Sequence, residues 1–141
     1  MSGQEEGLIG LVEVPKKQAQ IILESGYLYL EMGNYKEAEE VFAGCASLLP
    51  RSDVPQLGLG QLYLSQEQYD KAAKAYQKAI ELNPTSPNAY VFLGEVYLFQ
   101  KKTDQAVQML EKAQEIEKDE PSSATDMARS LLEAQRLGTF V

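Results

Sequence analysis

The sequence has no histidine and only one cysteine, Cys45, among its 141 residues. Without histidine, the chain lacks the commonest general base, the commonest metal ligand and any Ser-His or Cys-His nucleophile pair. A single cysteine cannot form an internal disulfide, and nothing else in the sequence indicates an oxidising compartment. The sequence therefore argues against an enzyme, and it predicts no cofactor and no metal site.

Basic charge and long apolar runs are scarce as well. Thirteen Lys and Arg residues stand against 21 Asp and Glu residues, and the net charge of -8 repels nucleic acid and anionic membrane surfaces. No apolar run suits a transmembrane helix, and residues 1–14 lack the basic start and apolar core of a secretory signal. A hydrophobic content of 44% fits one globular domain. We therefore expect a cytoplasmic chain that binds protein, with neither nucleic acid nor membrane as a partner.

What the sequence does contain is a repeat with a fixed period. Gly26, Gly60 and Gly94 are each 34 residues apart. Pro50 and Pro84 close the first two units, and Lys118 takes this place in the third. A 34-residue period predicts a solenoid of helix-turn-helix repeats. The same offset relates Tyr29, Tyr63 and Tyr97; Ala38, Ala72 and Ala106; Phe42, Tyr76 and Leu110; and Cys45, Ala79 and Ala113.

Over residues 19–118 this pattern resembles the tetratricopeptide repeat. The resemblance implies an all-α fold, an α-solenoid of three repeats (about 19–52, 53–86 and 87–120) within a domain of residues 18–138. A further helix over 121–137, with Met127, Leu131 and Leu132 on one side, is expected to cap the last repeat and to end at Gly138. The six repeat helices are predicted at about 18–32, 35–48, 54–66, 69–82, 87–100 and 104–117.

Residues at the expected helix ends support these boundaries. Asn34 with Glu37 resembles a capping box, and Gly33 suits a left-handed helix end. Ser86 followed by Pro87 is typical of an N-cap with proline at the first helical position.

Two kinds of glycine need separate explanations. Gly26, Gly60 and Gly94 recur with the repeat, so we expect that a crossing helix leaves no room for a side chain there. Gly58 does not recur, and we expect it to widen the concave groove of the solenoid. A phosphate-binding loop is excluded because Leu62 stands where a third glycine would be needed.

The concave wall of such repeats comes mainly from the first helix of each repeat, and the resemblance implies which residues form it. The wall is apolar with a few amides and one carboxylate, which suits an amphipathic helix or an extended segment with apolar anchors. Related repeats hold the carboxylate of a heat-shock protein with Lys, Asn and Arg on this wall, and the corresponding places carry apolar residues here. In the alternative interpretation the leucines and Val91 pack between helices. The expected wall residues are Gln20, Leu23, Tyr27, Leu30, Val54, Leu57, Gln61, Leu64, Asn88, Val91, Glu95 and Leu98.

Residues 1–17 belong to no repeat, and we expect them to form an N-terminal arm. Within the arm, residues 8–14 read LIGLVEV. They are either a frayed tail or a segment that pairs with another subunit or lies in the groove until a partner displaces it.

Three stretches resemble class II chaperones of bacterial type III secretion: YLEMGNYKEAEEVF, LGLGQLYLSQEQYDKAAKAY and ATDMARSLLEAQRLG. This resemblance implies a bacterial cytoplasmic chaperone that keeps a hydrophobic secreted translocator soluble by holding its segment in the groove. It also implies dimerisation through N-terminal helices, although the N-terminus here is short. Two alternatives stay open: a co-chaperone of the needle subunit, and a tetratricopeptide repeat scaffold for protein complexes. The sequence leaves the client, the host and the oligomeric state open.

Overall fold

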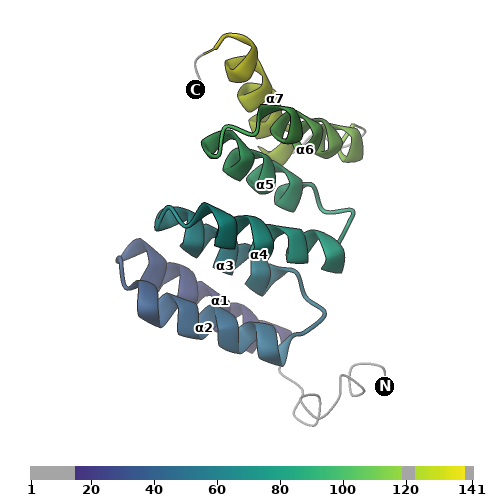
Figure 1. The fold of residues 1–141 in the computed structure, drawn as a ribbon. Helices are drawn as coiled ribbons and strands as arrows, with labels where there is room; N and C mark the ends of the chain where they lie inside the picture. The colour runs from purple at the N-terminus through teal and green to yellow at the C-terminus, as the bar shows by residue number, and fades with distance from the viewer. Residues whose placement is uncertain (1–14, 119–122, 139–141) are drawn as a thin grey trace.

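The computed structural model describes residues 15–118 and 123–138 (Figure 1). These residues form seven helices and no strand, so the predicted all-α fold is confirmed. The first helix begins at residue 16 instead of 18, and the other helix ends lie equally close to the predicted ones or closer. The N-terminal arm lies outside the described residues except for its last three positions. The helices are α1 (Lys16–Glu31), α2 (Tyr35–Leu48), α3 (Val54–Ser65), α4 (Tyr69–Leu82), α5 (Pro87–Phe99), α6 (Thr103–Ile116) and α7 (Ser123–Arg136).

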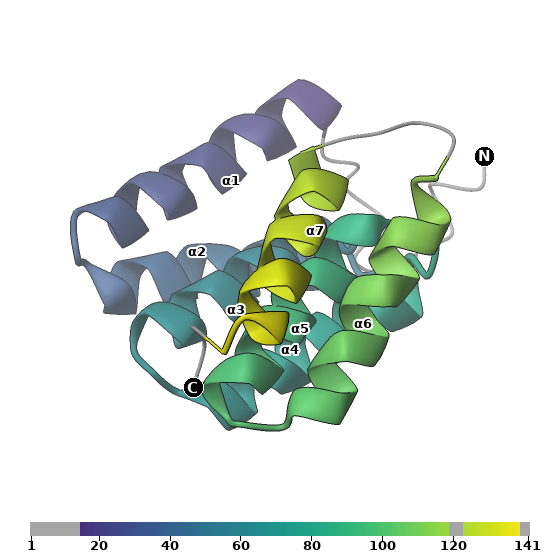
Figure 2. The same ribbon diagram turned by 90° about the horizontal axis from the view of Figure 1, so that it is seen from above.

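The first six helices form three antiparallel pairs, in which α1 packs on α2, α3 on α4 and α5 on α6. Consecutive pairs meet where α2 packs on α3 and where α4 packs on α5. Helix α7 packs against both α5 and α6 and covers the end of the third pair. Figure 1 shows the pairs stacked in chain order, and Figure 2 shows that the helix direction turns from pair to pair. This arrangement is the predicted α-solenoid with a C-terminal capping helix.

The space between α1 and α3 is filled by one ring, that of Phe42 from α2. A Cβ atom at Gly58 would lie 2.5 Å from this ring, and one at Gly26 would lie 2.8 Å from it. Real Cβ atoms do not approach a buried ring so closely, so both glycines are required by packing. The packing explanation for Gly26 is confirmed. The expectation that Gly58 widens the groove is wrong, because Phe42 occupies the space that the missing side chain leaves.

The same contact recurs in the other two repeats. A Cβ atom at Gly60 would collide with the ring of Tyr76, and one at Gly94 would lie 2.9 Å from the side chain of Leu110. Tyr76 and Leu110 are both fully buried. The 34-residue spacing of the glycines therefore follows from one repeated contact between the two helices of a pair.

The turn within each pair contains one residue with a left-handed backbone. This residue is Gly33 in the first pair (φ 79°), Glu67 in the second (φ 58°) and Lys101 in the third (φ 62°). The left-handed end predicted at Gly33 is confirmed. The predicted capping box is wrong, since the side chain of Asn34 makes no capping hydrogen bond in the turn that leads into α2. Ser86 does stand at the N-cap before Pro87, likewise without a side-chain bond.

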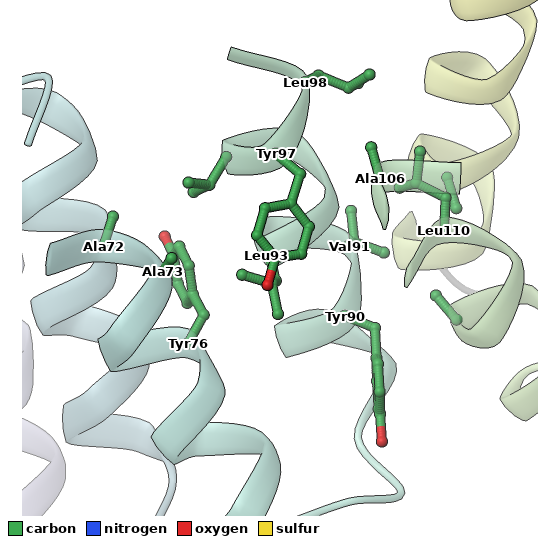
Figure 3. Close-up of a cluster of buried hydrophobic side chains, with 13 residues drawn as sticks. Ala72, Ala73, Tyr76, Tyr90, Val91, Leu93, Tyr97, Leu98, Ala106 and Leu110 are labelled. Carbon is green, nitrogen blue, oxygen red and sulfur yellow. The ribbon is translucent and has the colours of Figure 1, made fainter. Parts of the chain in front are cut away.

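The apolar core divides into a small N-terminal cluster and a larger C-terminal one. The small cluster surrounds Phe42 and includes Leu59 and Leu62 of α3. The larger cluster extends from α4 to α7 and is drawn in Figure 3. The predicted capping residues of α7 pack against the larger cluster; they are Met127, Leu131 and Leu132.

Candidate partner-binding groove

Ten of the twelve residues expected on the concave wall retain exposed surface. The three amide residues of these helices are exposed, whereas Glu95 and most of the apolar residues are half-buried. Val54, at the start of α3, is 40% exposed. The exposed members are Gln20, Val54, Gln61 and Asn88, and the half-buried members are Leu23, Tyr27, Leu30, Leu57, Leu64 and Glu95.

The prediction is wrong for Val91 and Leu98 of α5, which are only 1% and 2% exposed. Both residues belong to the larger core cluster together with Ala128 of α7. In Figure 3, Val91 lies on the side of α5 that faces α6 and α7. Because the capping helix covers this side of α5, the alternative interpretation as core residues is the right one here.

Two phenylalanines of α5 were missed by the sequence reasoning. Phe92 is half-buried, with its ring centroid 5.6 Å from that of Tyr76. Phe99 is 43% exposed and stacks on Tyr69 at 5.5 Å. They stand one position after Val91 and Leu98 and share the same seven-residue spacing. The seven-residue spacing of the two aromatic rings is visible in the sequence and could have indicated an exposed side of α5. Only the position of α7, however, decides whether the side with Val91 and Leu98 or the side with Phe92 and Phe99 is exposed.

An open pocket of about 820 Å³ lies between the N-terminal half of α1 and the start of α3. Ligand-binding pockets are commonly of this size and mostly apolar. The pocket brings together three of the predicted wall residues, Gln20, Leu23 and Val54, but none from the third repeat. Its described lining consists of Pro15, Lys16, Ala19, Gln20, Leu23, Leu49, Ser52 and Val54.

Three polar side chains form what we call the central polar cluster: Tyr27 of α1, Tyr76 of α4 and Glu95 of α5. Tyr27 and Glu95 occupy equivalent places in the first and third repeats. Tyr76 reaches the cluster over Gly60 of the second repeat. Burial raises the pKa of all three groups. The nearby Glu95 carboxylate and Tyr27 phenol raise the pKa of Tyr76 further.

A second apolar surface lies on α1 and was not anticipated. Ile21, Leu28 and Met32 are 59%, 57% and 59% exposed. Their spacing of seven and four residues puts them on one side of the helix. This side faces away from the small core, to which α1 contributes Leu23, Tyr27 and other residues. The α1 face, as we call these three residues, therefore remains unpartnered within the described chain.

The described residues offer little for other kinds of chemistry. Within residues 15–118 and 123–138, no group of three or more Cys, Asp or Glu side chains is placed to hold a metal ion. The thiol of Cys45 is buried, and this burial raises its pKa, which disfavours the reactive thiolate. None of the described helices has the length and apolar character needed to span a bilayer.

Comparison with known families identifies the class of protein. The tetratricopeptide repeat family model matches residues 29–75 and 63–129, which together make up well over half of the chain. The chain belongs to the tetratricopeptide repeat family. A search of curated proteins gave no match.

Solved structures with the same fold include a translocator chaperone of type III secretion. The chaperone SycD of Yersinia enterocolitica aligns with a TM-score of 0.80 and 23% identity, over 92% of this chain and 100% of SycD. SycD in complex with a peptide of the translocator YopD aligns with a TM-score of 0.78 and 23% identity, over 91% and 99% of the two chains. PcrH from Pseudomonas aeruginosa gives a TM-score of 0.78 and 20% identity, over 88% and 96%. At such identities the likeness establishes the shared fold.

Proposed function

We propose that this chain is a cytoplasmic chaperone of a bacterial type III secretion system. It binds a hydrophobic secreted translocator subunit and keeps that subunit soluble by holding one of its segments in the concave groove. Release requires no chemistry, which agrees with the absence of a catalytic constellation in the sequence.

The observation that carries the proposal is the end-to-end match with the translocator chaperone SycD, which PcrH matches in fold as well. The aligned regions include nearly all of this chain and nearly all of theirs. A shared fold alone does not determine function, because tetratricopeptide repeats serve many binding roles. The apolar pocket between α1 and α3 adds a site of suitable size and chemistry for the anchor residues of a bound segment.

Two other functions use the same surface. A needle-subunit co-chaperone would receive an amphipathic helix, and a scaffold would join two folded proteins. We favour the translocator because SycD, a protein of the same fold, has been solved with a peptide of the translocator YopD.

Affinity purification of the tagged chain from its native bacterium, followed by mass spectrometry, tests the proposal. We expect one hydrophobic secretion substrate in stoichiometric amount. A needle-type subunit would favour the co-chaperone, and folded cytoplasmic or envelope proteins would favour the scaffold.

A matched pair of substitutions tests whether the client occupies the pocket. Val54 lines the pocket and is 40% exposed, whereas Leu48 at the end of α2 is 41% exposed and does not line it. We expect Val54→Asp to weaken client binding roughly tenfold or more, as for an anchor residue, and Leu48→Asp to leave it unchanged. Equal binding by both variants, with unchanged thermal unfolding, would overturn the pocket assignment.

The α1 face makes a second copy of this chain a candidate partner. One solved form of SycD is described as an alternative dimer. If the α1 face carries such a dimer, Leu28→Asp makes the chain monomeric in sedimentation equilibrium while preserving its helical content. An unchanged molecular mass would exclude the α1 face as the contact.

A further inference from the structure

Helix α4 carries a row of lysines on its outer side. Lys71, Lys74 and Lys78 follow one another at spacings of three and four residues, which places them on one side of the helix, and all three are exposed. We call these three residues the α4 lysine face. The chain has only 13 Lys and Arg residues and a net charge of -8, so three neighbouring cations give this surface a charge opposite to that of the whole molecule.

The α4 lysine face is not part of the repeat pattern. The residues 34 positions earlier and later are mostly acidic or uncharged, and they are Glu37, Glu40 and Gly44 in α2 and Gln105, Gln108 and Lys112 in α6. The packing that all three repeats share therefore does not explain why α4 has lysine at these positions.

The contacts of these lysines within the described chain leave their charges available to a partner. The ammonium of Lys78 lies 3.8 Å from the carboxylate of Glu81, but both side chains are more than half exposed, so the ion pair contributes little. Lys74 forms no hydrogen bond or ion pair with another described residue. Like charges three and four residues apart on a helix also repel one another, and an anionic partner would relieve this repulsion.

A pocket of about 270 Å³ lies beside the α4 lysine face, between α3 and α4. Lys71 and Lys74 line this pocket together with Leu59 and Tyr63. The hydroxyl of Tyr63 donates a hydrogen bond of 2.8 Å to Glu39 of α2, and the ammonium of Lys71 lies 5.0 Å from the centre of the tyrosine ring. The pocket therefore combines apolar surface with two cations, and the nearby carboxylate of Glu39 already accepts a hydrogen bond from Tyr63.

This pocket lies on a different side of α3 from the concave wall. Residues spaced by three and four positions form one row along a helix, and α3 has two such rows. The rows are Gln56, Leu59 and Tyr63 in the pocket and Leu57, Gln61 and Leu64 among the expected wall residues. A protein bound at the α4 lysine face is therefore placed to leave the groove open.

We propose that the α4 lysine face binds an acidic segment of a second protein, with one apolar side chain of that segment in the pocket between α3 and α4. The ammonium groups of Lys71 and Lys74 pair with carboxylates next to the apolar side chain, and Lys78 extends the charge match along α4. This inference goes beyond the proposed function, because it adds a second partner at a surface outside the groove.

The surrounding charges favour a short acidic segment over a nucleic acid or an anionic membrane. Helix α2, whose Glu39 reaches Tyr63 at the pocket, also exposes Glu37 and Glu40. A large polyanion would extend past α4 and be repelled by these carboxylates, since charges act over about 8 Å at physiological ionic strength. A segment with a few carboxylates can lie along α4 alone.

A random peptide library displayed on phage tests the inference without knowledge of the partner. The full-length wild-type chain, Lys71→Gln/Lys74→Gln and Lys17→Gln/Lys36→Gln are used as separate baits. Lys17 and Lys36 are exposed residues of α1 and α2 outside the pocket, and their substitution changes the net charge by the same amount. We expect the wild-type chain and this control to select peptides with acidic residues around one apolar residue, and the α4 variant to lose this class. The proposal is wrong if the wild-type chain selects no such class or if the α4 variant retains it.

Fluorescence anisotropy with one selected acidic peptide then measures and locates the contact. Lys71→Gln/Lys74→Gln should weaken binding about fivefold, as expected for the loss of two exposed charge contacts. Val54→Asp, which changes the pocket between α1 and α3, should leave the affinity unchanged because the peptide lies elsewhere. A loss with Val54→Asp as large as with the α4 variant would place the peptide in the groove and overturn the inference without affecting the proposed function.

A matched pair of substitutions in α3 tests the pocket without changing a lysine. Gln56 is half-buried and lines the pocket, whereas Gln66 is exposed just after α3 and does not line it. We expect Gln56→Glu to weaken binding of the acidic peptide about threefold through repulsion, and Gln66→Glu to leave the affinity unchanged. If the two variants bind alike, the peptide does not use this pocket.

Sedimentation velocity of the chain alone tests a second copy as the occupant. The acidic α2 of another copy could cover the α4 lysine face, and the lysine substitutions would then lower the molecular mass. We expect the same mass for the wild-type chain and Lys71→Gln/Lys74→Gln. A lower mass for the variant would assign the surface to self-association and overturn the proposal of an acidic second protein.

Discussion

Helices α1 and α5 hold the same place in their repeats but have different surroundings. Helix α5 buries eight of its residues, whereas α1 buries only Ala19 and Gly26. Helix α5 lies among α4, α6 and α7, while α1 contacts α2 and, less extensively, α3. The repeat pattern therefore determines which side of a first helix meets its own partner, and the position in the stack determines how much of the rest is covered.

This difference separates surface from core among equivalent residues. Leu23 and Val91 stand at the same repeat position, yet Leu23 lines an open pocket and Val91 is fully buried. The first repeat thus retains the apolar surface that a partner can use, while the third repeat uses its equivalent surface to hold α7.

Substituting these two residues tests the comparison most severely. We expect Val91→Asp to lower the free energy of unfolding by about 4 kcal/mol or more, because a charge is buried without a partner. Leu23→Asp should lower it by only about 1–2 kcal/mol, since the carboxylate can reach water. Urea unfolding followed by circular dichroism measures both values. Equal losses would show that α7 does not cover α5 in solution.

Glycine substitutions test the close contact within a pair. We expect Gly60→Ala to destabilise the chain by about 1–3 kcal/mol, because the added methyl group meets the buried ring of Tyr76. Gly44 in α2 is the control, since nothing lies within 4 Å of the position that its Cβ would take. Gly44→Ala should stabilise the chain by about 0.5–1 kcal/mol through helix propensity alone. Opposite signs in urea unfolding would support the packing explanation, and the same sign would contradict it.

The turns allow a smaller test of how the repeats differ. Glu67 and Lys101 hold the left-handed backbone that Gly33 adopts in the first repeat. Replacing either residue by glycine should raise the free energy of unfolding by less than about 1 kcal/mol, because relief of strain exceeds the added flexibility of the unfolded chain. Gly33→Ala should lower it by about 1 kcal/mol. A loss of stability in Glu67→Gly, measured by thermal unfolding, would contradict this account.

The smallest expected effect concerns the charge of Glu95. Burial raises its pKa above the ordinary value of 4.5, so the folded state binds the proton more tightly than the unfolded state. The ionised carboxylate therefore opposes folding above the raised pKa, and this effect disappears as the pH falls below 4.5. We expect Glu95→Gln to unfold at a slightly higher temperature than the wild-type chain at pH 7 and at nearly the same temperature at pH 4. A wild-type chain that is the more stable at pH 7 would show that Glu95 has a partner in the folded chain.

The sequence by itself determined the repeat, its helices and the contact at its centre. The 34-residue period, the recurring glycines and the ring or leucine opposite each glycine describe interactions within one helical pair. Such short-range contacts leave a readable pattern because they are made in the same way in all three repeats. For this reason the predicted helix ends agree closely with the observed ones.

Only the tertiary structure decided which parts of the wall remain exposed. Helix α7 buries Val91 and Leu98 while Phe99 stays at the surface, and Phe42 of the first repeat fills the space beside Gly58 of the second. These outcomes depend on contacts between neighbouring units and on where the stack ends. The sequence pattern does not show which of several equivalent residues is buried. Burial at an end of the solenoid depends on what packs there and not on the repeat itself.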